Sequence, residues 1–75
     1  NKYTMKIYYE NILFLVNQLI DGVSSGERIL FSSIYRKLNA EGDTNAYMAL
    51  VTVGKRPLYT RKDVYKDEKG HWYKK

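Results

Sequence analysis

The chain has 75 residues and no cysteine, which excludes disulfides and thiolate metal sites and leaves room for one domain with a modest core. Its hydrophobic content of 44% excludes a disordered tail. The net charge of +5 lies entirely in residues 54–75, which hold eight basic and three acidic residues, whereas the charges of residues 1–53 cancel. This asymmetry predicts an anionic partner for the C-terminal segment. The alternative is a solvated basic tail, which the many aromatic residues of the segment disfavour.

The sequence contains no candidate membrane span or secretion signal. No run approaches the roughly 20 apolar residues that a span needs, and the longest candidate, residues 12–20, is interrupted by Asn17 and Gln18. The N-terminus lacks a basic region followed by an apolar block and a cleavage site. We therefore expect an intracellular, cytoplasmic protein without a membrane partner. The eight tyrosines, with many Lys and Ile, are typical of an AT-rich genome and hint at a viral or phage source.

The clearest element is a helix over residues 6–21. Leu13 and Phe14 widen its apolar face, so we expect it to pack on two sides and to be able to form a homodimer. Gly22 and the Ser-Ser-Gly sequence after it end the helix. The apolar face itself repeats with helical spacing and comprises Tyr8, Ile12, Leu15, Val16, Leu19, Ile20 and Val23.

Residues 27–31 predict a short strand, because the run is β-rich and too short for a helix. Ser32 or Ser33 then serves as the N-cap of a second helix, whose apolar residues are Ile34, Tyr35 and Leu38. Residues 39–43 close that helix, and Asp43 or Thr44 can cap the next one.

Residues 45–53 fit two interpretations. As a helix, they bury Ala46, Ala49, Leu50 and Val53, while Gly54 ends the helix and Pro57 prevents its continuation. As a strand, alternate residues face opposite sides, which the β-branched residues favour. We favour a helix over residues 44–53, because a capping residue precedes the stretch and a glycine follows it. The strand interpretation would give two helices and a three-stranded antiparallel sheet.

The C-terminal part predicts a β-hairpin. Residues 58–66 are extended, residues 67–70 form a type I turn with Gly70 at positive φ, and residues 71–74 return. If Lys66 faces His71, the cross-strand pairs that follow are Tyr65 with Trp72, Val64 with Tyr73 and Asp63 with Lys74.

The order of these elements resembles the winged helix-turn-helix superfamily over nearly the whole chain. The passage that carries the resemblance is Leu50, three residues, Gly54, three residues, Leu58, then a basic strand, a turn, and Trp72 with Tyr73. The resemblance implies an α+β fold of three helices and a C-terminal hairpin wing. It also implies binding to double-stranded DNA, with the third helix in the major groove and the hairpin along the backbone.

On this interpretation the outward residues of the third helix contact bases. The Asn45 amide suits adenine, and Met48 or Thr52 suits a thymine methyl group. Basic residues neutralise phosphates, giving affinity and salt dependence without sequence information. The phosphate contacts expected are Lys55, Arg56, Arg61, Lys62, Lys69 and Lys74.

A second interpretation is an adaptor or inhibitor that binds a host protein. Tyr47, Met48 and Val51 are apolar where a DNA-reading helix usually carries polar residues, and an outward apolar patch marks a protein interface. Catalysis is not expected, because the carboxylates are scattered singly and Ser24 and Ser25 lack a base partner. No metal or cofactor is expected, since His71 has no companion ligand in the pattern that a metal requires.

Overall fold

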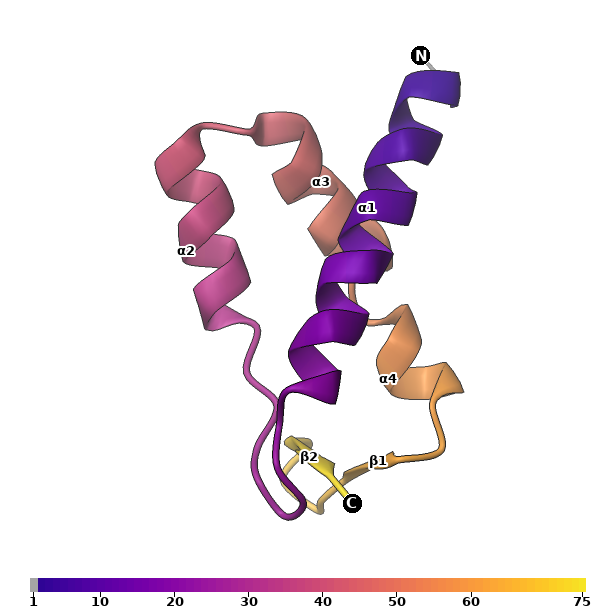
Figure 1. Ribbon diagram of the computed structural model, residues 1–75, viewed down its shortest axis with the longest axis vertical. Coiled ribbons are helices and arrows are strands. Elements are labelled where there is room, and N and C mark those ends of the chain that lie inside the picture. The colour runs from indigo at the N-terminus through magenta and orange to yellow at the C-terminus, as the bar shows by residue number, and fades with distance from the viewer. Residues whose placement is uncertain (1) are drawn as a thin grey trace.

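The computed structural model describes residues 2–75, with side chains from residue 5 onward. It confirms a small α+β domain of helices followed by an antiparallel hairpin (Figure 1). The helices are α1 (Lys2–Asp21), α2 (Ser32–Glu41), α3 (Thr44–Val53) and α4 (Arg56–Thr60), and the strands are β1 (Val64–Lys66) and β2 (Trp72–Lys74). The hairpin lies at the end of the molecule opposite the start of α1. No helix in the described part of the chain is long and apolar enough to cross a membrane.

The core forms mainly where α1 packs on α3. On α1 the fully buried side chains are Ile12, Val16 and Ile20, which recur every fourth residue and therefore share one face. The facing residues of α3 are those that the helical interpretation predicted, Ala46, Ala49, Leu50 and Val53. The helix over residues 44–53 is confirmed and the strand interpretation is wrong. Helix α1 begins at Lys2, four residues before the predicted start.

The predicted N-caps of α2 and α3 differ in outcome. Asp43 is the N-cap of α3, as predicted, and its Oδ1 accepts a hydrogen bond from the Ala46 amide at 3.1 Å. The predicted serine cap of α2 is wrong. Phe31 holds the N-cap position without a side-chain hydrogen bond, and Ser32 is already helical. Gly42 ends α2 in the left-handed conformation, with φ of 69°.

The predicted extended segment of residues 58–66 is wrong at its beginning, because residues 56–60 form α4, and it is confirmed at residues 64–66, which form β1. Pro57 lies in the first turn of this helix, where its fixed φ suits a helix start and its missing amide proton costs nothing. Pro57 and Leu58 are buried, so α4 anchors the chain before the hairpin. Gly54 ends α3 with φ of −61° rather than in the left-handed conformation.

The hairpin exists, but its register differs by one residue from the predicted one. The pairs are Val64 with Lys74, Tyr65 with Tyr73, and Lys66 with Trp72. The turn causes the shift, because the Asp67 amide donates to the His71 carbonyl at 2.9 Å and Asp67 therefore pairs with His71. Gly70 has the expected positive φ, 86°. A slip of one residue moves side chains to the other face of the partner strand. Trp72 therefore lies opposite Lys66, on the same face of the hairpin, and not opposite Tyr65 as predicted.

The predicted strand over residues 27–31 is reduced to one bridge, between Arg28 and Tyr73. Neighbouring backbone hydrogen bonds extend this contact: the Ile29 amide donates to the Trp72 carbonyl at 2.8 Å, and the Lys74 amide donates to the Glu27 carbonyl at 2.9 Å. β2 therefore lies between β1 and the segment that precedes α2.

Candidate nucleic-acid interface

The outward face of α3 carries the predicted base-contacting residues. Met48 and Val51 are 52% and 56% exposed, and Asn45 and Thr52 are also exposed. The Thr52 hydroxyl donates to the Met48 carbonyl at 2.7 Å, which commits its proton to the helix and leaves its methyl group and oxygen lone pairs for other contacts. Within Thr44–Val53 there is no charged side chain, so this face is neutral and largely apolar.

Tyr47 differs from the other members of the predicted apolar patch. Its ring packs edge-on against Tyr35 of α2, with the ring centroids 5.3 Å apart and the planes at 67°. Burial of Tyr35, together with the nearby Tyr47, raises the pKa of the Tyr35 hydroxyl. Tyr47 thus joins α2 to α3, and the outward apolar patch consists of Met48 and Val51.

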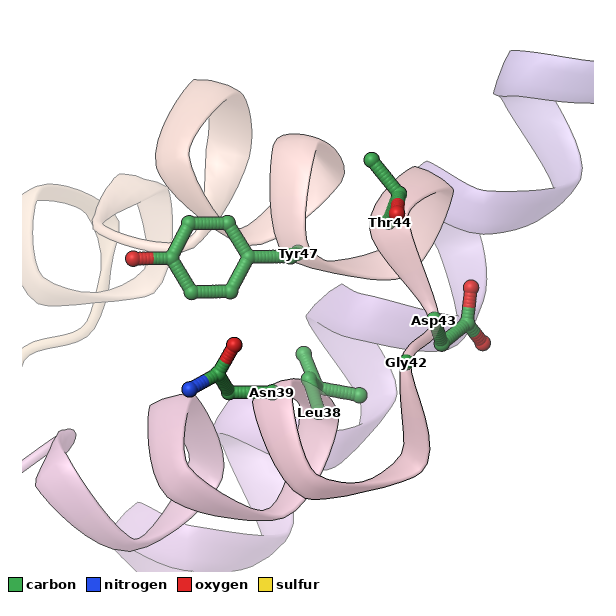
Figure 2. A pocket seen from close by; sticks show the side chains of 6 residues that line it. All are labelled: Leu38, Asn39, Gly42, Asp43, Thr44 and Tyr47. Atoms are coloured by element: carbon green, nitrogen blue, oxygen red, sulfur yellow. The ribbon is translucent and has the colours of Figure 1, made fainter.

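A pocket of about 170 Å³ lies beside this contact, between the end of α2 and the start of α3. Figure 2 shows Tyr47 and Asn39 facing one another across it, while the Asp43 carboxylate points away at its edge. Its other lining residues are Leu38, Gly42 and Thr44. None of the lining residues is basic, so this pocket is not suited to an anionic ligand.

Exposed basic side chains follow directly after α3. Lys55 lies between α3 and α4, Arg56 opens α4, Lys62 lies in the loop before β1, and Lys69 lies in the hairpin turn. All four are exposed and were predicted as phosphate contacts. Lys66 on β1 is exposed too and was not among the predicted contacts.

Arg61 has internal partners and is poorly placed for phosphate. Its side chain is only 19% exposed, and it forms ion pairs with Asp21 at 2.6 Å and with Asp63 at 2.7 Å. Its guanidinium also donates to the Asn17 side chain at 3.0 Å. The guanidinium holds the pKa of Asp63 at about 2, below the usual 3.8. Arg61 therefore links the end of α1 to the loop before the hairpin.

Lys74 is also used internally. Its side chain is 16% exposed and lies 3.8 Å from Asp63. The Nζ donates to the carbonyl of Ile20 at 2.9 Å and to that of Val23 at 3.5 Å. These carbonyls belong to the last turn of α1 and the segment after it, where a cation is favoured by the helix dipole.

The hairpin aromatics divide between the two faces of the ribbon. Trp72 packs edge-on against Tyr59 of α4, at 5.4 Å between ring centroids, and the Lys66 ammonium lies 5.7 Å from the Trp72 ring centroid. Tyr65 and Tyr73 stack on each other with centroids 5.5 Å apart. Burial and a hydrogen bond from its hydroxyl to Asp67 raise the pKa of Tyr73. Trp72 thus joins the hairpin to α4.

A groove that no sequence pattern indicated lies between the hairpin tip and the start of α2. It has a volume of about 310 Å³, and Arg28, Lys55 and His71 contribute its polar side chains. The remaining lining residues are Ile29, Leu30, Phe31, Tyr35, Leu58, Gly70 and Trp72. Sequence patterns could not reveal the groove, because it joins five segments that only the register of the hairpin and the presence of α4 bring together.

No group of three or more metal-ligating side chains gathers among the described residues. Comparison of the chain with family models, with curated proteins and with solved structures finds no match.

Proposed function

We propose that this protein binds double-stranded DNA as a small non-enzymatic regulator of transcription or of a viral or mobile genetic element. The observation that carries the proposal is the series of exposed cations from the end of α3 to the hairpin turn: Lys55, Arg56, Lys62, Lys66 and Lys69. The acidic residues Asp63 and Asp67 of this region are engaged by Arg61 and by the His71 amide. Glu68 in the hairpin turn is the remaining exposed acidic residue, so positive charge exceeds negative charge on this surface, and such an excess attracts a polyanion.

The connectivity supports a winged-helix arrangement. A long helix is followed by a bridge residue and by two helices joined by a two-residue turn. The short helix α4 then leads into a hairpin whose second strand holds the bridge to Arg28. In a winged helix, α3 would be the helix that enters the major groove and the hairpin would be the wing. The exposure of α3 on the side away from α1 is what such docking requires.

Within α3, Asn45, Met48 and Thr52 are the proposed base contacts. Asn45 lies in the first turn and is exposed, so its amide is free to form paired hydrogen bonds with adenine. Met48 and the methyl group of Thr52 supply apolar contacts for thymine. Asn45→Ala would then lower discrimination between sequences more than it lowers affinity for random duplex.

A salt titration tests the proposal. We expect log Kd for random duplex DNA to rise linearly with log salt, and Lys62→Ala to reduce the slope by about 0.9, the contribution of one phosphate contact. Lys37→Ala is the matched control, because Lys37 is an exposed lysine on α2 outside the proposed set. Equal slopes for the wild type and the Lys62→Ala variant would remove this part of the surface from the interface, and failure to bind duplex at low salt would refute the proposal.

A second candidate function is capture of a host protein through α3. The exposure of Met48 and Val51 favours it, since two neighbouring apolar side chains on an uncharged helix face suit a protein contact better than a phosphate backbone. Met48→Ser would then abolish complex formation with the host protein and leave duplex affinity unchanged. Under the DNA proposal the same variant lowers duplex affinity.

Homodimerisation through α1 is a further proposal about assembly. Ile7 and Phe14 are exposed and lie two helical turns apart on one side of α1. Burial of both in a symmetric contact would use the second apolar side of this helix. Sedimentation at increasing protein concentration should show a dimer for the wild type and a monomer for Phe14→Glu.

A further inference from the structure

We propose that the groove between the hairpin tip and the start of α2 holds an unpaired nucleotide of the bound DNA strand. This inference rests on the proposed DNA binding and extends it to the form of DNA that binds best. The groove is a second contact site, separate from the outward face of α3, and its occupant is a nucleobase with the phosphate attached to it.

The chemistry of the groove fits both parts of a nucleotide. Three aromatic residues line the groove: Phe31, Tyr35 and Trp72. All three are partly buried, so their rings are held by packing and still expose some surface to a ligand. Stacking of a base on aromatic side chains is favourable for every base, because each base has a π-face. Its volume of about 310 Å³ exceeds that of a single base.

The charges at the groove suit a phosphate. Arg28 and Lys55 both line it and both are exposed. The lining contains no Asp or Glu, although Asp67 and Glu68 lie in the adjacent hairpin turn. Of these, Asp67 is held by hydrogen bonds from the amides of Lys69 and His71, at 3.0 and 2.8 Å. The groove therefore combines apolar walls with a positive rim.

The position of the groove connects it to the proposed duplex interface. Lys55 follows α3 directly, and Gly70 follows Lys69 in the hairpin turn, and both Lys55 and Gly70 line the groove. A strand that contacts Lys55 and the hairpin turn together would pass along the groove that these residues line. A base that is paired cannot enter it, whereas a base in a single strand, a bulge or a mismatch can turn into it at a small cost in unstacking.

Trp72 provides a direct readout, because it is the only tryptophan of the chain. We expect an oligothymidylate to quench its fluorescence on binding, as a base stacks near the ring. We also expect a duplex that contains one unpaired thymine to bind about tenfold more tightly than the fully paired duplex, in line with the gain from one stacked base. Unchanged fluorescence with oligothymidylate at saturation would overturn the inference.

Two matched arginine variants separate the groove from general electrostatics. Arg28 lines the groove, whereas Arg36 is an exposed arginine of α2 that does not. Arg28→Ala should remove most of the preference for the unpaired base, and Arg36→Ala should keep it, although both variants lose one positive charge. Loss of the preference in both variants, or in neither, would contradict the groove as its origin.

The outcomes distinguish the inference from the proposed function. Binding to fully paired duplex with no preference for an unpaired base refutes the groove and keeps the DNA-binding proposal. Binding to oligothymidylate alone supports the groove and refutes duplex recognition. If a glutamate-rich peptide that contains phenylalanine quenches Trp72 and oligothymidylate does not, the groove binds an acidic protein segment instead and the inference is wrong.

Discussion

Arg61 shows how a residue that looks like a ligand contact from the sequence can be structural. It lies in the basic segment, but its guanidinium is shared among Asn17, Asp21 and Asp63. A guanidinium with several oriented acceptors is fixed in place, and it gains little from contact with a phosphate.

Arg61→Ala should therefore destabilise the fold and leave the proposed DNA contact largely intact. We expect a loss of about 1–2 kcal/mol in the free energy of unfolding, since charge-assisted hydrogen bonds are removed while Asp21 and Asp63 keep access to water. Urea denaturation measures this loss. Lys62→Ala is the control and should show the opposite behaviour, with unchanged stability and a smaller salt slope. Equal stability of the two variants would contradict the structural role of Arg61.

The lowered pKa of Asp63 makes the free energy of unfolding depend on pH in the acid range. Arg61 lowers the pKa of Asp63 to about 2 in the folded protein, from 3.8. Because the folded pKa is the lower one, the contribution of the carboxylate is complete above 3.8 and is lost as the pH falls toward 2. The difference in unfolding free energy between the wild type and Asp63→Asn should be constant near neutral pH and shrink over that acid range. A difference that keeps its full neutral-pH value at pH 2 would contradict the ion pair.

Gly54 decides how α3 ends, because there is no room for a side chain at this position. A Cβ at this position would overlap the carbonyl oxygen and the Cδ1 of Leu50, and Leu50 is almost fully buried. The glycine therefore allows α3 to end against its own last turn and the chain to enter α4. A glycine after an apolar run was correctly interpreted as the end of a helix, and the reason is this lack of space rather than a left-handed conformation, since its φ is −61°.

Gly54→Ala should destabilise the protein by about 1–3 kcal/mol, the usual cost of overpacking a core. Gly22→Ala is the matched control at the end of α1. A Cβ there would meet only the carbonyl oxygens of Gln18 and Leu19, at 3.6 Å, so we expect stability equal to or slightly above that of the wild type. Thermal unfolding of the two variants distinguishes steric overlap from a general effect of replacing glycine.

The cap of α3 gives a further prediction. Asp43→Ala removes the acceptor for the Ala46 amide and should cost about 1 kcal/mol in the free energy of unfolding, whereas Asp43→Asn keeps an acceptor and should cost less. Chemical denaturation of the two variants measures the difference. Equal losses would mean that the carboxylate acts through its charge rather than as a cap.

Elements with a local physical cause could be predicted from the sequence. Periodicity identified α1. The capping residue before residues 44–53 and the glycine after them favoured the helix α3, whose buried face followed from that choice, and the Asp43 cap followed from its side chain. The register of the hairpin could not be predicted, because it depends on the pairing of Asp67 with His71 inside the turn. The helix at residues 56–60 was missed for a related reason: Pro57 was interpreted as a stop for α3, whereas it starts α4.

For the candidate site, the exposed cations of the C-terminal half were predictable from composition and the roles of Arg61 and Lys74 were not. Both depend on contacts with α1 or its last turn across forty or more residues of sequence. The groove depends on the same long-range placement. Local patterns describe which side chains a segment carries, and the packing of distant segments decides which of them remain available to a ligand.

At the scale of the whole molecule, the two internal cations fasten the hairpin to the last turn of α1. Arg61 reaches Asp21, and Lys74 reaches the Ile20 carbonyl. The amide protons of β2 and of the last turn of α1 should therefore exchange with deuterium through one common opening, with similar free energies. Helix α2 packs mainly on α3 and should open more readily. The wall of the groove that α2 forms can then unfold locally while the hairpin stays attached to α1.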